Sequence, residues 1–385
     1  MLSKRRILTL LPAVILALVG WYWLRNGFEV DEPNSVDSTT TEEKLVTQTD
    51  PASDSNLTQV DRVDQLVTQL LGSLELLKQV HGEARGQAVI EEMFQTLEAS
   101  SAEDASRAIV RLLNTRQNAL AFGRFAPGED GFLSAYPSFR TALLDQLEKL
   151  DPAEAVDMGK SILADSENVD EWAISLRILS RHAQSIDDQN FLRGKVQELL
   201  HKDAWLEDPT FGFLHAFDAA VDGGALASIQ RMEELLESEH DRAVTHAATI
   251  SLDRLFQTHT QVGVEYLTNH PDFLNKAKGL RASLVARIDP ADTNGIQLAE
   301  AYLGDPSFSV EEKQTFFQLF PNFNTTYSYN LITESKVPTR TDMRQASIAA
   351  FTELSVWSTE NRYPEFQDDI DRAINRLAKA WKLEL

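Results

Sequence analysis

The chain contains no cysteine among its 385 residues, which excludes disulfide bonds, thiolate metal ligands and a cysteine nucleophile. It also lacks a Gly-x-Ser-x-Gly element, a Walker-type phosphate loop and a dinucleotide-binding fingerprint. There is no His-Glu-x-x-His pattern, and none of the eight histidines has a spacing that would bring imidazoles together on a metal. We therefore expect no catalytic residue, no bound metal and no cofactor.

Basic residues are scarce. The chain has 36 Lys and Arg against 59 Asp and Glu, with a net charge of -23. Residues 1–27 hold four of the basic residues and no acid, so residues 28–385 carry a net charge of -27. A surface this acidic repels phosphate groups, which argues against nucleic acid as a ligand. It favours a protein partner with a basic or mixed-charge surface.

Residues 1–27 are predicted to form a cytoplasmic tip and a transmembrane anchor. The run Ile7–Leu24 has no charged residue and would reach about 27 Å as a helix, close to the thickness of a bilayer core. Lys4, Arg5 and Arg6 precede it and acids follow, which places the N-terminus in the cytoplasm. A cleaved secretory signal is the alternative, although its apolar region usually spans about 7–15 residues.

An exported chain without cysteine fits a bacterial periplasm. We expect a single-pass protein of the bacterial inner membrane whose C-terminal domain faces the periplasm. Residues 28–59 contain eight acids, one lysine and mostly Ser, Thr and Pro otherwise. Such a composition cannot bury enough apolar surface to offset the entropy of ordering, which predicts a disordered acidic linker.

Residues 60–385 are predicted to form an all-α domain, because apolar residues recur there at helical spacing. The first stripe comprises Val63, Leu66, Val67, Leu70, Leu71, Leu74 and Leu77. Ser101, Asp151-Pro152 and Ser309 are expected to begin later helices. Residues 114–137 are predicted to be an aromatic-rich connection, and only residues 325–333 alternate like a strand.

The last helix has the clearest pattern. Its expected inward face carries Phe366, Ile370, Leu377 and Trp381. Its expected solvent face carries Asp368, Asp369, Asp371 and Arg372. A terminal helix of a stack has a neighbour on one side only, so these two faces predict a cap that closes the core.

Short repeats suggest how the helices stack. Ile174–Leu179 (ISLRIL) and Ile250–Leu255 (ISLDRL) match at four of six positions, 76 residues apart. This layout resembles HEAT-like helical repeats, and 294–306 (NGIQLAEAYLGDP) is similar to the closing helix of a tetratricopeptide repeat, whose opening Trp-x-x-Leu-Gly-x-x-Tyr pattern is missing. The resemblance implies an α-solenoid-like stack of helical hairpins.

Aromatic residues gather between positions 302 and 329, partly in a segment rich in Asn and Thr. Aromatic residues in loops often anchor protein interfaces. The predicted partner-binding residues are Tyr302, Phe308, Phe316, Phe323, Tyr327 and Tyr329. The alternative is that these rings fill the core beneath an irregular loop.

Residues 131–135 (GFLSA) are similar to part of the Phe-Asp-Tyr-x-Leu-Ser-Ala-x-Gly-Glu signature of lipase-specific foldases. Those proteins are also N-terminally anchored, with a variable stalk and an all-α periplasmic body. Here 129–131 (EDG) replaces Phe-Asp-Tyr, and Tyr136-Pro137 replaces the Gly-Glu ending.

We expect a non-catalytic interaction scaffold or accessory subunit that binds another envelope protein. The foldase resemblance implies an alternative role as an anchored folding or secretion helper. A hydrolase acting on envelope polymers is a third possibility, because two of the 59 acids could form a catalytic pair across a cleft.

Overall fold

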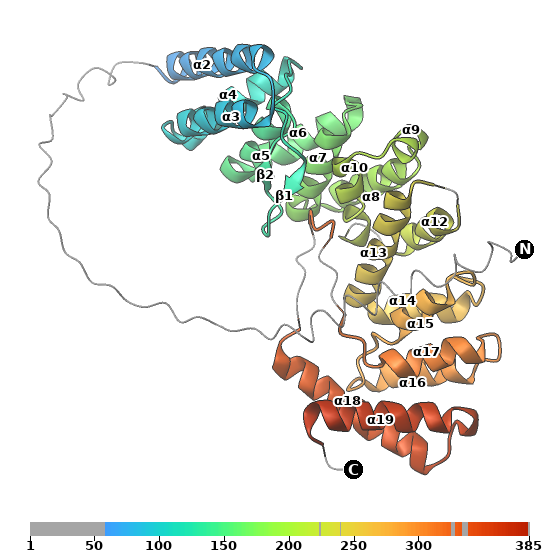
Figure 1. The fold of residues 1–385 in the computed structure, drawn as a ribbon. Coiled ribbons are helices and arrows are strands. Elements are labelled where there is room, and N and C mark those ends of the chain that lie inside the picture. The colour runs from blue at the N-terminus through green and yellow to red at the C-terminus, as the bar shows by residue number, and fades with distance from the viewer. Residues whose placement is uncertain (1–57, 223–224, 239, 325–327, 333–337, 384–385) are drawn as a thin grey trace, which may run out of the picture. The chain divides into compact units, whose positions relative to one another are not determined.

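A computed structural model describes residues 58–222, 225–238, 240–324, 328–332 and 338–383. The chain divides into two units, Met1–Asn56 and Leu57–Leu385, and all described residues belong to the second (Figure 1). The predicted anchor at residues 7–24 lies outside the described residues, as does the predicted linker except for its last two positions. Within the described part of the chain, no helix combines the length and the apolar character needed to cross a membrane.

Over its described residues the second unit is all-α, as predicted, apart from one short hairpin. The helices before residue 223 are α2 (Gln59–Gln79), α3 (Glu83–Glu98), α4 (Ala102–Asn114), α5 (Phe139–Leu150), α6 (Pro152–Asp165), α7 (Val169–His182), α8 (Ile186–Leu200), α9 (Asp203–Glu207), α10 (Phe211–Ala216) and α11 (Ala219–Asp222). The later ones are α12 (Ala225–Glu237), α13 (Arg242–Thr258), α14 (Thr260–Asn269), α15 (Lys278–Val285), α16 (Thr293–Gly304), α17 (Val310–Leu319), α18 (Arg340–Thr359) and α19 (Gln367–Trp381), with a 3-10 turn η2 (Pro364–Phe366) before α19.

Local sequence signals begin these helices where they were expected. The Ser101 side chain caps α4, Asp151 caps α6 with Pro152 at its first position, and Ser309 caps α17. Each side-chain oxygen accepts a hydrogen bond from a backbone N–H of the first turn, which has no partner inside the helix. These three predictions are confirmed.

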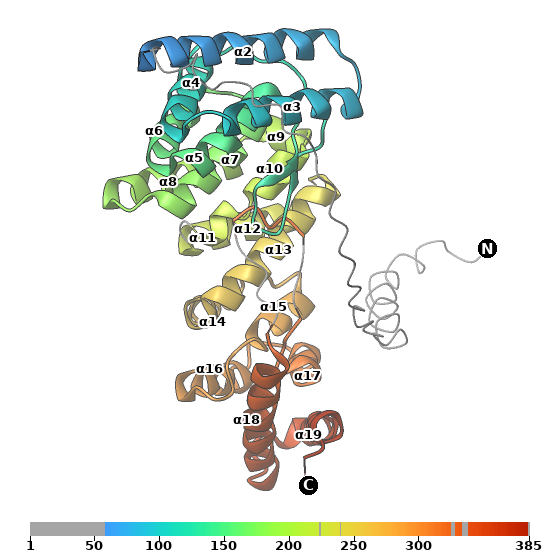
Figure 2. The same cartoon turned by 90° about the vertical axis from the view of Figure 1, so that its left-hand side faces the viewer.

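Each helix packs mainly against helices close to it in the chain (Figures 1 and 2). Thus α2 contacts α3 and α4, α4 contacts α5, α5 contacts α6, and α6 contacts α7. Farther along, α12 contacts α13, α13 contacts α14, α15 contacts α17, and α18 contacts α19. One connected hydrophobic core runs through these contacts from Val63 to Leu377.

The connection predicted at residues 114–137 contains the one sheet of the described residues. Strands β1 (Ala126–Pro127) and β2 (Leu133–Ala135) pair antiparallel, with Ala126 opposite Ala135 and Pro127 opposite Leu133. The strand-like alternation at 325–333 does not form a strand over its described part, residues 328–332. Alternation alone could not identify the pairing strand, because a strand needs a partner to satisfy its backbone.

The C-terminal helix is amphipathic as predicted, with two corrections. Phe366, Ile370 and Leu377 are buried. Asp369, which was expected in water, is only 6% exposed and accepts a hydrogen bond from Gln314 at 3.2 Å. Trp381, which was expected inside, is only half-buried. The reason is that α19 packs against both α17 and α18, which moves the boundary of the buried face toward Asp369.

Candidate interaction site at the hairpin

The β1–β2 hairpin is the centre of the candidate site. Its tip contains Gly131 at φ 75°, a backbone conformation that favours glycine. A Cβ atom at this position would lie 2.3 Å from Arg181 Nη2 and 2.3 Å from the main-chain oxygen of Leu331. Only glycine allows this close approach. We define the hairpin site as residues 119–138 together with Arg177, Arg181 and the segment 328–332.

Arg177, on α7, fixes the hairpin from inside the core. Its guanidinium is fully buried and donates to Asp145 at 2.7 Å, to Glu148 at 2.6 and 2.9 Å, and to the main-chain oxygen of Gly131 at 2.6 Å. Asp145 also accepts a hydrogen bond from the Tyr136 hydroxyl at 2.9 Å. Burial, reinforced by the Asp145 charge, raises the pKa of Tyr136. A buried polar network with its partners in place restricts the hairpin to one arrangement.

Phe132 connects the hairpin tip to three cations. The Lys149 ammonium and the Arg177 and Arg181 guanidiniums lie 4.7, 4.8 and 5.2 Å from the centre of its ring. Cations at this distance are attracted to an aromatic face. Arg181 also donates to the main-chain oxygen of Asp130. The turn is therefore held through its backbone and through its one aromatic side chain.

The segment 328–332 comes from between α17 and α18 but lies beside the hairpin tip, as the two views agree (Figures 1 and 2). Arg254, on α13, donates to the main-chain oxygens of Ser328 at 2.6 Å and Tyr329 at 2.7 Å. The N–H of Ile332 donates to Asp218 at 2.7 Å. The segment thus joins parts of the chain that are far apart in sequence.

Tyr329 packs among imidazoles beside this segment. Its ring makes edge contacts with His215 and His246, with centroid distances of 5.4 and 5.5 Å. Burial, together with the Arg254 charge, lowers the pKa of His215 to about 4. Burial also lowers the pKa of His246. Both imidazoles are therefore neutral at pH 7 and act as ring surfaces rather than cations.

An open cleft of about 470 Å³ lies between the hairpin and the segment. Its wall includes Pro127, Phe211, His215 and Tyr329. The Nδ1 atom of His215 is buried and has no hydrogen-bond partner among the described residues. Phe211 is 54% exposed. The cleft therefore offers aromatic surface to a ligand, with polar side chains of Glu129, Ser328 and Asn330 also in its wall.

The strand-like stretch before β1 presents apolar side chains to water. Leu120 is 63% exposed and Phe122 is 38% exposed, whereas Ala121 between them is buried. Phe122 has φ 62°, a left-handed conformation that is costly for a large side chain. Backbone strain of this kind persists only where the surroundings fix the chain, and it is common at functional sites.

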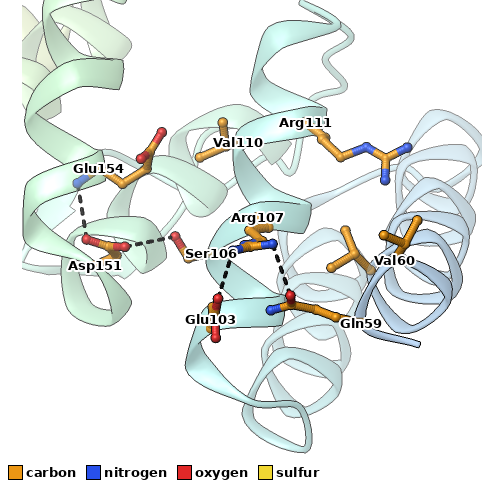
Figure 3. A pocket seen from close by; sticks show the side chains of 10 residues that line it. Gln59, Val60, Glu103, Ser106, Arg107, Val110, Arg111, Asp151 and Glu154 are labelled. Atoms are coloured by element: carbon orange, nitrogen blue, oxygen red, sulfur yellow. Dashed lines mark hydrogen bonds and ion pairs between the residues drawn. The ribbon is translucent and has the colours of Figure 1, made fainter. Parts of the chain in front are cut away.

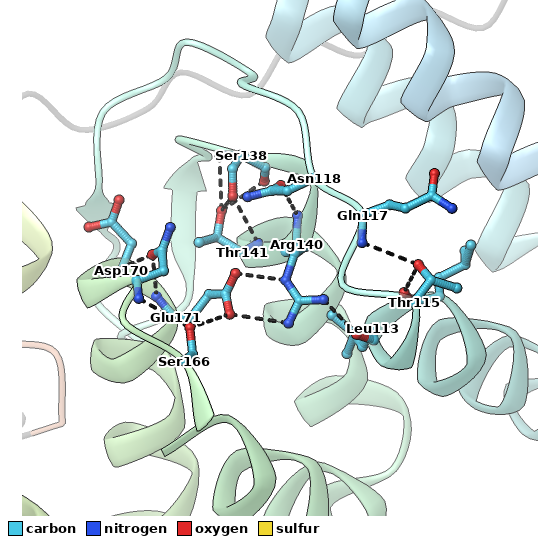
Figure 4. A network of polar contacts seen from close by, with 12 residues as sticks. Leu113, Thr115, Gln117, Asn118, Ser138, Arg140, Thr141, Ser166, Asp170 and Glu171 are labelled. Carbon is cyan, nitrogen blue, oxygen red and sulfur yellow. Dashed lines mark hydrogen bonds and ion pairs between the residues drawn. The ribbon is translucent and has the colours of Figure 1, made fainter. Parts of the chain in front are cut away.

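A second buried network anchors the chain where it leaves the hairpin (Figure 4). Arg140, in the first turn of α5, donates to both oxygens of Glu171 at 2.7 and 3.2 Å and to the main-chain oxygen of Leu113. Asn118 accepts from the Arg140 N–H at 3.1 Å. Burial, with a smaller contribution from Glu171, raises the pKa of the neighbouring Asp170 to about 6. This network joins the end of α4 to the starts of α5 and α7 at the base of the hairpin.

A groove of about 540 Å³ between α2, α4 and α6 has a different character (Figure 3). Val60, Val63 and Val110 form its apolar part. Arg107 donates to Glu103 at 2.8 Å and to Gln59 at 3.2 Å. Arg107 and Glu103 are both exposed, and an exposed ion pair contributes little, so this groove supplies weaker recognition features than the hairpin site.

The six predicted partner-binding residues divide into three groups. Tyr302, Phe308 and Phe316 are buried, and the Tyr302 hydroxyl donates to Glu312, which also pairs with Arg281. Their burial agrees with the core alternative. Phe323 and Tyr329 are half-buried, and Tyr329 belongs to the hairpin site. Tyr327 lies outside the described residues.

Sequence reasoning missed the arginines that organise the site. Arg177 and Arg254 each stand within one of the two matched hexapeptides, and each is buried and binds main-chain oxygens of an irregular segment. The available signal was an arginine among apolar residues on the inward face of a helix. Such a charge must find partners inside the protein.

Within the described residues, no group of three or more His, Asp or Glu side chains is arranged to hold a metal ion. The arrangement instead binds the main chain of an irregular segment, through fixed guanidinium donors, a carboxylate acceptor and aromatic walls. In comparisons with known proteins, no family model and no curated protein matches this chain.

Proposed function

We propose that this chain is a membrane-anchored, periplasm-facing α-solenoid that binds another envelope protein and performs no catalysis itself. The proposed arrangement is an anchor through residues 7–24 in the bacterial inner membrane, a disordered linker over 28–59 and a helical-repeat domain over 60–385. The solenoid assignment is supported by packing between chain neighbours and by the two matched hexapeptides. Their Ile, Ser and Leu positions are buried in both α7 and α13.

The observation that carries the binding role is the hairpin site. A buried, hydrogen-bonded base holds an irregular segment that exposes Leu120 and Phe122, with Phe211 in the adjoining cleft. Apolar and aromatic side chains displayed on a fixed loop are the usual anchors of protein interfaces. The net charge of -27 beyond residue 27 favours a partner whose rim around these anchors is basic or mixed.

Crosslinking in intact cells followed by mass spectrometry tests this role. The wild-type chain should give a stoichiometric crosslink to a folded envelope protein. Replacing both anchors (Leu120→Ser with Phe122→Ser) should reduce its yield at least tenfold. Val310→Ser removes an apolar side chain that is 51% exposed on α17 and should leave the yield unchanged. Equal yields for the two variants would contradict a role for the hairpin site.

The proposed topology has its own test. A reporter that is active only in the periplasm should be active when fused after Leu385, and the intact mass of the membrane form should include residues 1–24. Activity of a cytoplasm-only reporter at that position would contradict the topology. Loss of the N-terminal residues would support the cleaved-signal alternative.

A folding or secretion helper is the second candidate. The residues that are similar to the foldase signature, 131–135, lie in the hairpin tip and β2. A helper would bind an unfolded client and raise its refolding yield, whereas a scaffold would bind only the folded partner. Measuring refolding yield of a crosslinked partner with and without this chain separates the two roles.

A further inference from the structure

The segment 328–332 is held in the hairpin site in the way that a bound peptide would be held. Its contacts run to side chains 74 to 150 residues away in sequence. In three hydrogen bonds a main-chain oxygen of the segment is the acceptor. Arg254 donates to Ser328 and Tyr329, and Arg181 donates to Leu331. The main-chain N–H of Ile332 supplies a fourth, to Asp218. Main-chain contacts of this kind do not require a particular sequence.

Two side chains add specificity to this recognition. Leu331 is fully buried, and Tyr329 packs between the rings of His215 and His246. Ser328 is exposed, and Asn330 accepts from Arg254 at 3.2 Å. The segment therefore presents an aromatic residue and, two positions later, a leucine, along a bent backbone in which Tyr329 is left-handed.

Three features indicate that this internal occupant can be exchanged. Tyr329 has φ 61°, a strained conformation that a different peptide need not adopt. Arg254 and Asp218 are nearly or fully buried and pair with each other at 3.1 Å, so they keep their positions and can bind the main chain of another peptide. The open cleft of about 470 Å³ is lined by Ser328 and Tyr329 of the segment and by Phe211, so a ligand can reach the segment from solvent.

We propose that the groove between the hairpin, α10 and α13 is a binding site for a short peptide segment of the partner, with an aromatic residue followed two positions later by leucine. The segment 328–332 occupies this groove as an internal ligand. A partner peptide enters through the cleft and displaces it, with its own main chain accepting the hydrogen bonds of Arg254 and Arg181. This inference rests on the proposed role of the chain in binding another protein.

The test measures binding of a fluorescein-labelled peptide, Gly-Ser-Tyr-Asn-Leu-Ile-Gly, to the full-length chain in detergent micelles. Leu331→Asp places a charge in a fully buried position and should release the internal segment. We expect this variant to bind the peptide at least tenfold more tightly than the wild type. Adding Arg254→Met should abolish the gain, and Val310→Asp, at an exposed position, should give wild-type affinity.

A second release variant guards against a folding defect. Tyr329→Ala removes the ring that packs against His215 and His246 without placing a charge in the core. It should also bind more tightly than wild type, while its circular dichroism stays helical. A labelled peptide carrying aspartate in place of its leucine should not bind either variant.

The inference is overturned if both helical release variants bind the peptide no better than the wild type. It is also overturned if the aspartate peptide binds as well as the leucine peptide. Neither result depends on the cellular crosslink at Leu120 and Phe122, so the two proposals can fail separately. If the crosslink fails while the peptide binds, the partner assignment is wrong and the groove remains a peptide site.

Discussion

Replacing Arg177 by methionine should be one of the most damaging single substitutions in this domain. The Arg177 side chain is fully buried, as are its two carboxylate partners Asp145 and Glu148. Methionine fills a similar volume but donates no hydrogen bond. It leaves two carboxylates side by side in the core and the Gly131 carbonyl without its donor. Removing one partner of a buried ion pair costs about 3–5 kcal/mol of unfolding free energy.

Urea unfolding of the chain spanning residues 58–385, followed by circular dichroism at pH 7, measures this loss. Arg111→Met is the matched control, because Arg111 pairs with Asp64 at the surface and both side chains are 53% exposed. An exposed pair contributes about 0–1 kcal/mol, so the control should remain close to the wild type.

A double variant tests the stated cause. If the cost arises from uncompensated carboxylates, Glu148→Gln should restore part of the stability lost in Arg177→Met, because it removes one of the two charges. Hydrogen exchange of the Leu133 amide, which donates to Asp145 at 3.4 Å, reports whether the hairpin detaches. A loss below about 1 kcal/mol for Arg177→Met would refute the reasoning, as would full additivity of the two substitutions.

A chain of residues 60–385 lacks the Thr58 side chain that caps α2, so its unfolding free energy in urea should be about 1 kcal/mol lower than that of a chain of residues 58–385. Equal urea midpoints for the two chains would argue against a stabilising cap. Gly131→Ala should cost about 1–3 kcal/mol in thermal unfolding, because φ at this residue is 75° and the new Cβ atom meets the backbone of Leu331. Gly72→Ala is the control in the middle of α2, where the new Cβ atom meets no other atom within 4 Å, and it should stabilise the domain by about 0.5–1 kcal/mol. Asp170 has a folded pKa of about 6, above its unfolded value, so its buried charge costs stability as pH rises through about 4–6, and the full cost is present above pH 6. Asp170→Asn should therefore stabilise the domain at pH 7 by at most about 3 kcal/mol, and by less because water reaches the half-buried carboxyl. This gain should vanish near pH 4. A gain of equal size at both pH values would contradict the raised pKa of Asp170.

The sequence by itself determined where the helices lie. Apolar spacing and caps act within one or two turns, so Ser101, Asp151 and Ser309 marked helix starts without knowledge of any neighbour. The all-α class followed from the same local signals. The faces of α19 were predicted only in part, because the burial of Asp369 depends on its contact with Gln314 of α17, 55 residues earlier.

Only the tertiary structure decided which residues form the candidate site. The aromatic residues between 302 and 329 looked alike in sequence, yet Tyr302 and Phe316 are buried whereas Tyr329 joins the hairpin site. Gly131 and Leu331 meet across 200 residues because Arg181 and Arg254 bind the segment from two separate helices. Periodicity reports one face of one helix, and it carries no information about which distant backbone a buried arginine will bind.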